Sequence, residues 1–493
     1  MSTRTLVTIL CAVAFPFFSA AEETRPNVLL IAVDDLNDWL GCLGTHPQVQ
    51  TPNMDRLAAR GTLFTNAHCQ APICGPSRAS LLTGLYPWSN GVYQQPGKGL
   101  SNDTRTFQGH LLPQYFEEHG YKTLGVGKIT HGINPKKVFM EYGRQGSSGP
   151  KPENGFRFHY HLPDVPYSGT QTDWGAFPDH DTEMPDYEVA SWTVEQLGRR
   201  HDKPFFLAAG FVRPHVPFYV PEKWFAAYPL ETLVLPEVRI DDLDDVPEIG
   251  RAIHEMPKYP KLAWLQANEN EQLKLAVQAY LACITFVDHQ VGRVLDALDA
   301  SPYAENTTIL LFSDHGYHLG EKDRISKHTL WEESTRVPLI VARARSEANP
   351  SDAKVVNRSV GLIDIFPTLL ELSHLPAKEN NEGFSLFPLM ENPEADWREA
   401  TLTVYPRGSY AMRTDRYRYI HYEDGSEELY DHGNDPNEWT NLASDAEFAG
   451  VIDSLLHLLP EDAVPYHPST SRSPINAWFE THLKSSLGGA EKK

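Results

Sequence analysis

The first residues that could carry out chemistry are a cysteine and an arginine four positions apart. Residues 71–84 read APICGPSRASLLTG, and the stretch after Cys74 has the pattern of a short helix ended by Gly84. A group just before a helix lies at the positive end of its dipole, beside free backbone N–H groups, which suits a nucleophile or a bound anion. Arg78 follows one turn later on the same side. The residues alone leave Cys74 as a core residue, half of a disulfide, a metal ligand or a nucleophile.

Acidic side chains follow two apolar stretches of the chain. NVLLIAV runs into Asp34-Asp35, and NTTILLFS runs into Asp314-His315. Adjacent carboxylates repel one another, and the carboxyl ends of parallel strands are where α/β sheets bind ligands. Either pair alone also fits a helix cap or a turn, but both together predict a site for a hard divalent cation, Ca²⁺ or Mg²⁺. Ordinary thiol catalysis has no use for such a site, which points to a modified cysteine.

Strands and helices must bring these side chains together, and the sequence pattern predicts both kinds of element. Five nearly uninterrupted apolar stretches have the pattern of buried parallel strands: 27–33, 122–127, 204–212, 306–313 and 337–342. Helical patterns cover 51–61 and 271–300, the second with apolar residues at helical spacing. This alternation predicts an α/β sheet with helices on both faces.

Two long segments and the end of the chain follow other patterns. Residues 134–190 and 218–268 are rich in Pro, Gly, His, Tyr and Asp, and they predict functional lids or insertions. Four residues in or next to these two segments are candidates to line a sugar pocket, or else pack as ordinary loop residues: His159, His161, Trp174 and Arg213. Beyond residue 393, short alternating stretches at 416–422 and 427–431 predict a small antiparallel sheet, with a helix near 448–459.

Composition and the amino terminus limit the function. The 493-residue chain has a formal net charge of −22, which argues against nucleic acid as a partner. A basic residue, a short apolar run and small residues predict an export signal over residues 1–21, so we expect a periplasmic or secreted protein. We find no other apolar run long enough for a bilayer, so no membrane association is expected after cleavage. The pairing of Cys42, Cys69 and Cys283 stays open.

The residues around Cys74 resemble a known family. Cys-Gly-Pro-Ser-Arg at 74–78, followed by Leu-Thr-Gly at 82–84, is similar to the C-x-P-S-R signature of the type I sulfatases. Further stretches in the same order resemble the iduronate-2-sulfatase branch: 33–44, 126–132, 204–218, 312–321 and 428–443. The resemblance implies an alkaline-phosphatase-like α/β domain over 22–393, with a large mainly parallel sheet, and a smaller C-terminal antiparallel-sheet subdomain over 394–493.

The same resemblance implies a cofactor set and a role for each site residue. Cys74 would be converted by a maturation enzyme to 3-oxoalanine (formylglycine), whose hydrate attacks the sulfur and also reaches the metal. One calcium ion would be held by Asp34, Asp35, Asp314 and His315, and Arg78 would hold the hydrate. The sulfate-binding and proton-transfer residues would be Lys128, His131, His215 and Lys327, with His215 as the acid and His131 as the base.

The expected reaction is the hydrolysis of sulfate esters of a sulfated saccharide, from an algal polysaccharide or a glycosaminoglycan. Two alternatives remain. One is a phosphatase or phosphodiesterase of the alkaline phosphatase superfamily, whose Ser or Thr nucleophile and two zinc ions do not match Cys74. The other is a glycan-binding protein that kept the fold and lost catalysis.

Overall fold

The structure, a computed structural model, describes residues 25–96, 100, 110–152, 171–255, 259–348 and 353–470. The predicted signal at 1–21 and two of the sugar-pocket candidates, His159 and His161, lie outside these residues. In the described part of the chain, no helix is both long and apolar enough to span a bilayer.

A nine-stranded sheet forms the centre of the molecule, in the order β12-β2-β11-β8-β1-β6-β3-β4, with β13 also paired to β2. Its strands are β1 (Asn27–Val33), β2 (Thr62–His68), β3 (Lys122–Gly127), β4 (Glu141–Gln145), β6 (Phe205–Phe211), β8 (Thr307–Ser313), β11 (Arg336–Ala342), β12 (Lys354–Val356) and β13 (Val360–Gly361). The run β8-β1-β6-β3-β4 is parallel throughout. Four of the predicted parallel strands are thereby confirmed as β1, β3, β6 and β8.

The fifth predicted strand, β11, has the predicted position and the wrong direction. It pairs antiparallel to both β8 and β2. No helix crosses the sheet within residues 314–335, which connect β8 to β11. The end of β8 lies beside the start of β11, where Gly316 N donates to Ser334 O at 3.0 Å. The chain therefore starts β11 at the edge where β8 stops. Its partner β2 was not predicted, because polar residues interrupt its sequence TLFTNAH.

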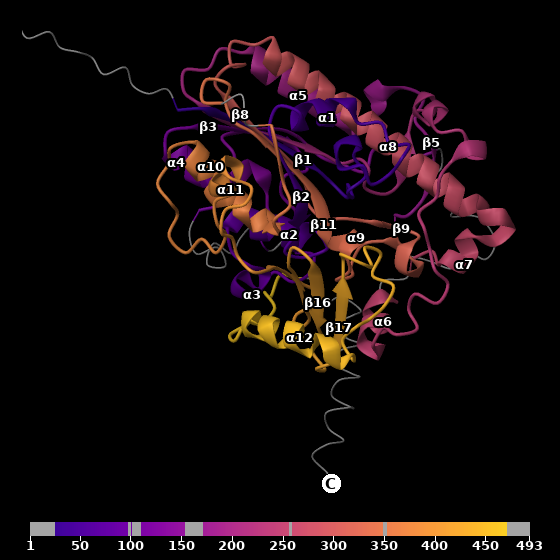
Figure 1. Ribbon diagram of the computed structural model, residues 1–493. Coiled ribbons are helices and arrows are strands. Elements are labelled where there is room, and N and C mark those ends of the chain that lie inside the picture. The colour runs from indigo at the N-terminus through magenta and orange to yellow at the C-terminus, as the bar shows by residue number, and fades with distance from the viewer. Residues whose placement is uncertain are drawn as a thin grey trace, which may run out of the picture.

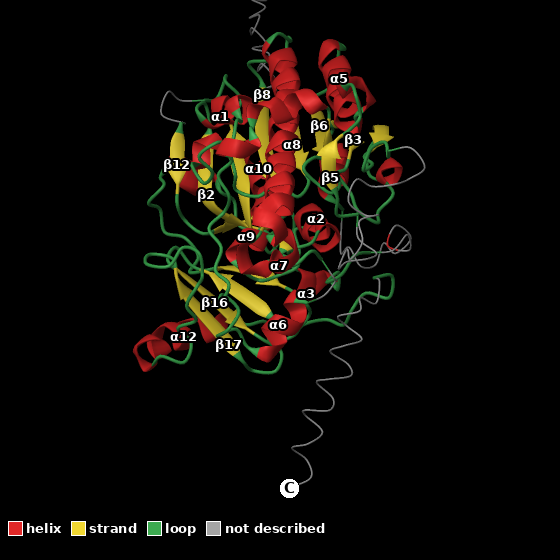
Figure 2. Ribbon diagram, turned by 90° about the vertical axis from the view of Figure 1, so that its right-hand side faces the viewer, coloured by secondary structure: helices red, strands yellow, loops and turns green. Residues whose placement is uncertain are grey.

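Helices cover both faces of the sheet, as predicted (Figures 1 and 2). In β1, Leu29, Ile31 and Val33 face one core and the alternate residues face the other, which is the two-residue period of a strand buried on both sides. The helices of the first face are α1 (Pro52–Ala58), α5 (Pro185–Gly198) and α8 (Ala267–Asp299). Those of the second face are α2 (Cys74–Thr83), α4 (Leu112–Glu118), α10 (Ile365–Leu372) and α11 (Phe387–Glu391).

The predicted C-terminal sheet is present as four antiparallel strands in chain order. They are β14 (Thr401–Val404), β15 (Tyr410–Arg413), β16 (Tyr417–His421) and β17 (Glu427–Asp431). Helix α12 (Ala449–Leu455) packs on this sheet through Ile452 and Leu455, at the end of the molecule opposite α5 (Figure 1).

The two long segments contain more regular structure than predicted. Helix α5 begins inside the first of them, and the second holds β7 (Phe218–Val220), α6 (Glu248–His254) and α7 (Leu262–Leu265). The sugar-pocket hypothesis is wrong for Trp174 and Arg213, which are each 1% exposed: Trp174 lies in the core, and Arg213 donates to backbone carbonyls.

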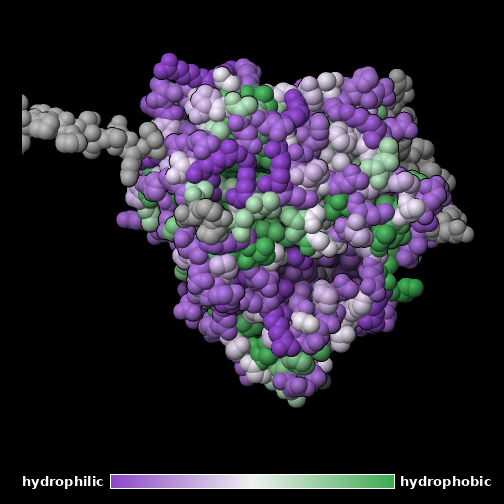
Figure 3. All heavy atoms as spheres, turned by 45° about the horizontal axis from the view of Figure 1, so that its top comes forward, coloured by the Kyte–Doolittle hydropathy of each residue, from purple (hydrophilic) through white to green (hydrophobic). Residues whose placement is uncertain are grey.

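The remaining short elements are α3 (Pro87–Asn90), α9 (Glu332–Thr335), β5 (Trp174–Ala176), β9 (His318–Leu319) and β10 (Ile325–Ser326). On the face shown in Figure 3, hydrophilic side chains cover most of the surface and hydrophobic ones form small, separate patches. The cysteines of the described residues are unpaired.

Candidate active site

The ten predicted site residues come together at the carboxyl edge of the central sheet. Loops after β1, β3, β6 and β8 supply the acids, histidines and one lysine, the start of α2 supplies Cys74 and Arg78, and Lys327 directly follows β10. Cys74 is the first residue of α2 rather than the residue before it, and the helix ends at Gly84 in the left-handed conformation, φ 72°. The parallel strands thus bring together residues that are up to 281 positions apart in the chain, Asp34 and His315.

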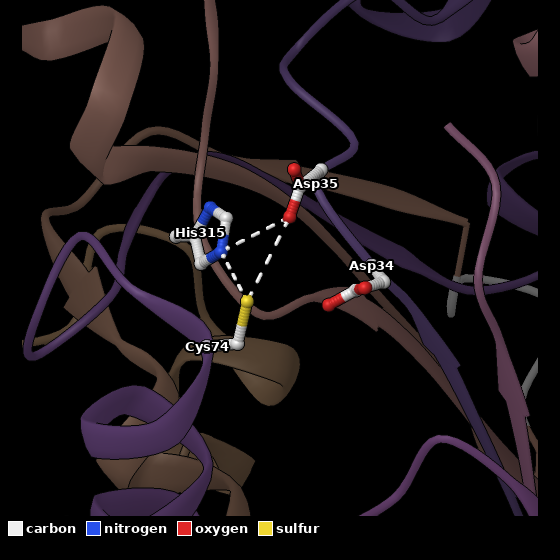
Figure 4. A group of neighbouring side chains, drawn as sticks. All are labelled: Asp34, Asp35, Cys74 and His315. Carbon is white, nitrogen blue, oxygen red and sulfur yellow. Dashed lines mark hydrogen bonds and ion pairs between the residues drawn. The ribbon is translucent and has the colours of Figure 1, made fainter. Parts of the chain in front are cut away.

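Four of these side chains point toward one another as a candidate metal centre (Figure 4). One donor atom each from Asp34, Asp35, Cys74 and His315 lies within 4.8 Å of the others. His315 Nε2 lies 3.2 Å from Cys74 Sγ and 3.3 Å from Asp35 Oδ1. His315 Nδ1 donates to Gly316 O at 2.9 Å, so Nε2 is the ring nitrogen that faces the cluster and could bind a metal ion.

An orphaned oxygen shows that this cluster fits a cation. Asp35 Oδ2 is buried and has no hydrogen-bond partner. A buried carboxylate oxygen without a partner is costly, and a hard divalent cation would satisfy it. Asp35 also has a left-handed backbone, φ 62°, a conformation that non-glycine residues adopt mostly at functional sites.

Arg78 is buried between two of the acids and forms an ion pair with each. Its Nη2 donates to Asp34 Oδ1 at 3.0 Å and its Nε to Asp314 Oδ2 at 2.8 Å. Burial and the Cys74 charge oppose ionisation of Asp34, but Lys128, His215 and Arg78 outweigh them and hold its pKa well below the ordinary value. For Asp314, burial dominates and raises the pKa to about 7 in spite of Arg78. Asp314 Oδ1 accepts from Asp35 N at 3.2 Å.

Positive charge surrounds Cys74, which is 1% exposed. Lys327 Nζ lies 3.4 Å and Lys128 Nζ 3.7 Å from Sγ. Burial would raise the thiol pKa, but Lys128, Lys327 and His315, with a hydrogen bond from His131, bring it well below its ordinary value. An anionic group attached at this position is therefore strongly favoured.

His215 enters the site from the loop after β6. Its Nε2 lies 4.0 Å from Asp34 Oδ2, and its Nδ1 donates to Val216 O at 2.7 Å, so Nε2 is the nitrogen that faces the site. Arg213 Nη1 donates to His215 O at 3.1 Å. Asp186 in turn accepts from the backbone N–H groups of Val212 and Arg213. This chain of contacts fixes the loop that carries the imidazole.

Sequence reasoning missed the residues that hold the aspartate loop. Tyr280 Oη donates to Asp35 O at 2.7 Å and accepts from Asn37 N at 2.9 Å, which clamps the strained turn. Ser77 Oγ donates to Asp314 O at 2.5 Å. Tyr280 lies in the apolar stripe of α8, so its pattern in the sequence predicts only a core residue.

The chain is similar to known proteins over most of its length. A family model described as "Sulfatase" matches residues 26–375, and one described as "N-sulphoglucosamine sulphohydrolase, C-terminal" matches 320–463. A "Sulfatase" of Formosa agariphila is 45% identical over 448 residues, 89% of this chain and 87% of that protein. The "Iduronate 2-sulfatase" of Mus musculus is 29% identical over 87% of this chain and 93% of its own length. Among solved structures, a phosphonate monoester hydrolase of Agrobacterium radiobacter superposes with a TM-score of 0.72 at 26% identity, over 88% of this chain and 95% of the other.

Proposed function

This chain belongs to the sulfatase family, and from that premise we propose that it hydrolyses sulfate esters of sulfated saccharides, using a modified Cys74 and one bound calcium ion. The observation that carries the proposal is the convergence of Cys74, six basic or imidazole side chains and a carboxylate cluster with an unpartnered oxygen. A sulfate ester is hard to attack because anionic oxygens surround its sulfur, and this arrangement supplies the charge that offsets them.

Asp34, Asp35, Asp314 and His315 are the residues that would hold the calcium ion, with residue 74 beside them. The bound ion would neutralise charge on the sulfate oxygens, and residue 74, as formylglycine, would supply a hydroxyl nucleophile. The unpartnered Asp35 Oδ2 and the proximity of Asp34, Asp35, Cys74 and His315 support this ligand set.

The remaining side chains are proposed to bind the sulfate group and to transfer protons. Lys128, Lys327 and Arg78 lie where they orient the sulfate and stabilise charge that builds up during cleavage. His215, with Nε2 facing the site, is the proposed acid that protonates the departing sugar oxygen. His131, hydrogen bonded to Cys74, is the proposed base that accepts a proton from the residue 74 group when sulfate is released.

The proposed substrate is a sulfated carbohydrate of an algal polysaccharide or a glycosaminoglycan, supported by the name of the iduronate 2-sulfatase relative. Export is supported by the signal pattern at residues 1–21, and a formylglycine-generating enzyme is the partner that the C-x-P-S-R pattern requires.

A phosphonate or phosphate ester is the second candidate substrate. The likeness to a phosphonate monoester hydrolase favours it, because the two chains share fold and nearly full length. The first experiment therefore compares 4-nitrophenyl sulfate with 4-nitrophenyl phosphate and its phosphonate monoester, followed by sulfate release from a panel of defined sulfated oligosaccharides.

We expect kcat/KM to be highest for sulfate. Peptide mass spectrometry over residues 71–84 of the same preparation should show the mass loss of Cys-to-formylglycine conversion. Higher activity on the phosphate or phosphonate would overturn the proposal, and absence of turnover with any ester in converted protein would favour a glycan-binding role.

A further inference from the structure

An arginine without a counter-ion lies beside the catalytic cluster. Arg324 is 1% exposed; its Nη1 donates to His254 O, whereas Nε and Nη2 have no hydrogen-bond partner. Within the described residues no carboxylate forms an ion pair with it. Other buried arginines differ, since Arg78 binds two aspartates and Arg398 binds Asp364. Burying a cation without an anion is unfavourable, so the position calls for an external partner.

Two stacked rings connect Arg324 to the catalytic lysine. The guanidinium carbon lies 4.9 Å from the Tyr259 ring centroid. Tyr259 stacks on His328 at 5.8 Å and 25°, with its Oη 3.3 Å from His328 Nδ1. His328 directly follows Lys327, whose Nζ lies 3.4 Å from Cys74 Sγ. The rings of Tyr259 and His328 thus lie between Arg324 and the lysine that faces Cys74.

The backbone between them is constrained. His328 has a left-handed conformation, φ 79°, which is rare for a residue with a side chain. Its N–H donates to Pro72 O at 3.2 Å, two residues before Cys74. The ring also packs against Tyr405 of the C-terminal part, with centroids 5.7 Å apart. Strain of this kind persists where the surrounding structure holds a functional geometry in place.

A second donor without an acceptor lies beside Tyr405. Gln94 is 2% exposed, its side chain approaches that of Tyr405, and its Nε2 has no hydrogen-bond partner. Pro96, two residues on, packs closely against Gly75, the neighbour of the nucleophile: a Cβ on Gly75 would lie 2.3 Å from Pro96 Cδ. Arg324 and Gln94 therefore flank Tyr405 with N–H groups, and neither has an acceptor for them.

We propose that Arg324 and Gln94 form a subsite for a second oxyanion of the substrate, beside the sulfate that is cleaved. The occupant is a carboxylate or a second sulfate on the same saccharide, because unused donors around an unpaired cation select charged oxygen acceptors. This inference rests on the proposed sulfatase function, and it narrows the substrate to saccharides with two anionic groups.

The test measures kcat/KM on three matched glycosides: a monosulfated hexoside, the same sugar with a uronic carboxylate, and the same sugar with a second sulfate. For wild-type holoenzyme, we expect at least one dianionic substrate to exceed the monosulfated one by about 10- to 100-fold, the range for hydrogen bonds to charged groups. Arg324→Gln should bring that ratio close to one. Arg324→Lys should retain part of it, because the charge remains and the forked donor geometry is lost.

Gln94→Leu is the second variant, and it decides the question if Arg324→Gln fails to fold. It should lower the ratio about 3- to 10-fold, since a neutral donor contributes less than a charged one. Gln290→Leu is its matched control, another buried glutamine with an unpartnered Nε2 on α8, and Arg398→Gln is the control for Arg324. Both controls should keep the wild-type ratio.

The possible outcomes separate the two proposals. A preference for the carboxylate alone, the second sulfate alone, or both supports the subsite and identifies its occupant. Sulfate release without any preference in the wild type, or with a preference that all variants retain, overturns the subsite and leaves the sulfatase function intact. No sulfate release from these glycosides or from 4-nitrophenyl sulfate contradicts the sulfatase function itself.

Discussion

The molecule contains two buried charge clusters that are built differently. The catalytic cluster gathers Asp34, Asp35 and Asp314 with Arg78 and two lysines, and it leaves Asp35 Oδ2 without a partner. The second cluster joins the central sheet to the C-terminal sheet. We call it the junction cluster; it consists of Glu332, Arg413, Arg418, His432 and Glu438.

In the junction cluster each acid faces an arginine. Glu332 Oε2 lies 3.1 Å from Arg413 Nε and also contacts Arg418. Glu438 Oε1 lies 2.6 Å from Arg418 Nε and 3.0 Å from His432 Nε2, and its Oε2 accepts from Glu332 N at 2.8 Å. By spacing alone, the two glutamates and His432 could hold a metal ion, but the arginines already neutralise them.

In the junction cluster, arginines neutralise every acid, whereas the catalytic cluster contains a carboxylate oxygen without a partner. Both are buried and rich in carboxylates, so neither burial nor the number of acids identifies the functional one. The informative features are an oxygen without a partner, a left-handed aspartate and a nucleophile among cations. The following predictions test that distinction, from the largest expected effect to the smallest.

Replacing Cys74 with Ala should abolish the function of the catalytic cluster and spare the fold. We expect sulfate release to fall by about 10⁴-fold or more, since the residue supplies the nucleophile. The free energy of unfolding should change by only about 1 kcal/mol for loss of one small buried group. Steady-state kinetics and thermal unfolding measure the two effects. Cys283→Ala, at a cysteine buried in the core, is the control and should keep its activity.

Breaking the junction cluster should have the opposite result. Glu332→Gln leaves Arg413 and Arg418 partly uncompensated, and we expect a loss of about 3–5 kcal/mol in the free energy of unfolding. Denaturant titration measures this change. A loss below about 1 kcal/mol would show that the junction cluster contributes little to the stability of the folded chain.

Calcium should stabilise the protein through the catalytic cluster alone. With calcium at about 100 times its Kd, linkage predicts a gain of about 2.7 kcal/mol in the wild type. Asp35→Asn should remove most of this gain, since it removes a carboxylate of the proposed ion site; the calcium-free protein should be less stable than the wild type, because Lys327 loses its buried counter-charge. Thermal unfolding with calcium and with a chelator measures both. Glu332→Gln should keep the calcium-dependent shift, and its loss there would contradict the assignment of the ion to the catalytic cluster.

Acid should weaken the junction cluster progressively. Burial opposes ionisation of Glu332, but Arg413, His432 and Arg418 outweigh it and hold its pKa well below 4.5; the pKa of Glu438 is also lowered, chiefly by Arg418. As the pH falls, Glu332 is protonated in the unfolded chain at a higher pH than in the folded chain. The stability that its ionised form contributes above pH 4.5 should therefore be lost as the pH falls below that value. The slope is about 1.4 kcal/mol per pH unit for each proton taken up. Unfolding curves across this range should show a shallower loss in Glu332→Gln than in the wild type.

Much of the fold and site follows from local pattern. Uninterrupted apolar stretches ending in Asp-Asp and Asp-His identified the strands and the acids, because a parallel sheet gathers such ends at one edge. The direction of β11 did not follow, since it depends on where the preceding loop leaves the chain. The clamp by Tyr280 and the unpaired state of Arg324 did not follow either. Both depend on which residues, distant in sequence, come to lie beside them.

The assigned roles of the ten site residues and the division of the chain near residue 393 remain predictions. Motif resemblance supplied the roles, and the geometry supports them by proximity.

The burial of Cys74 has a consequence for the order of events in biosynthesis. Its side chain is 1% exposed, and the Gln94–Pro96 loop closes over the turn that carries it. An enzyme that oxidises this thiol must reach Cys74 and its neighbours, and α2 is fully buried once the chain has folded. The proposed conversion therefore has to precede folding, so a chain that folds faster than it is modified would become permanently inactive.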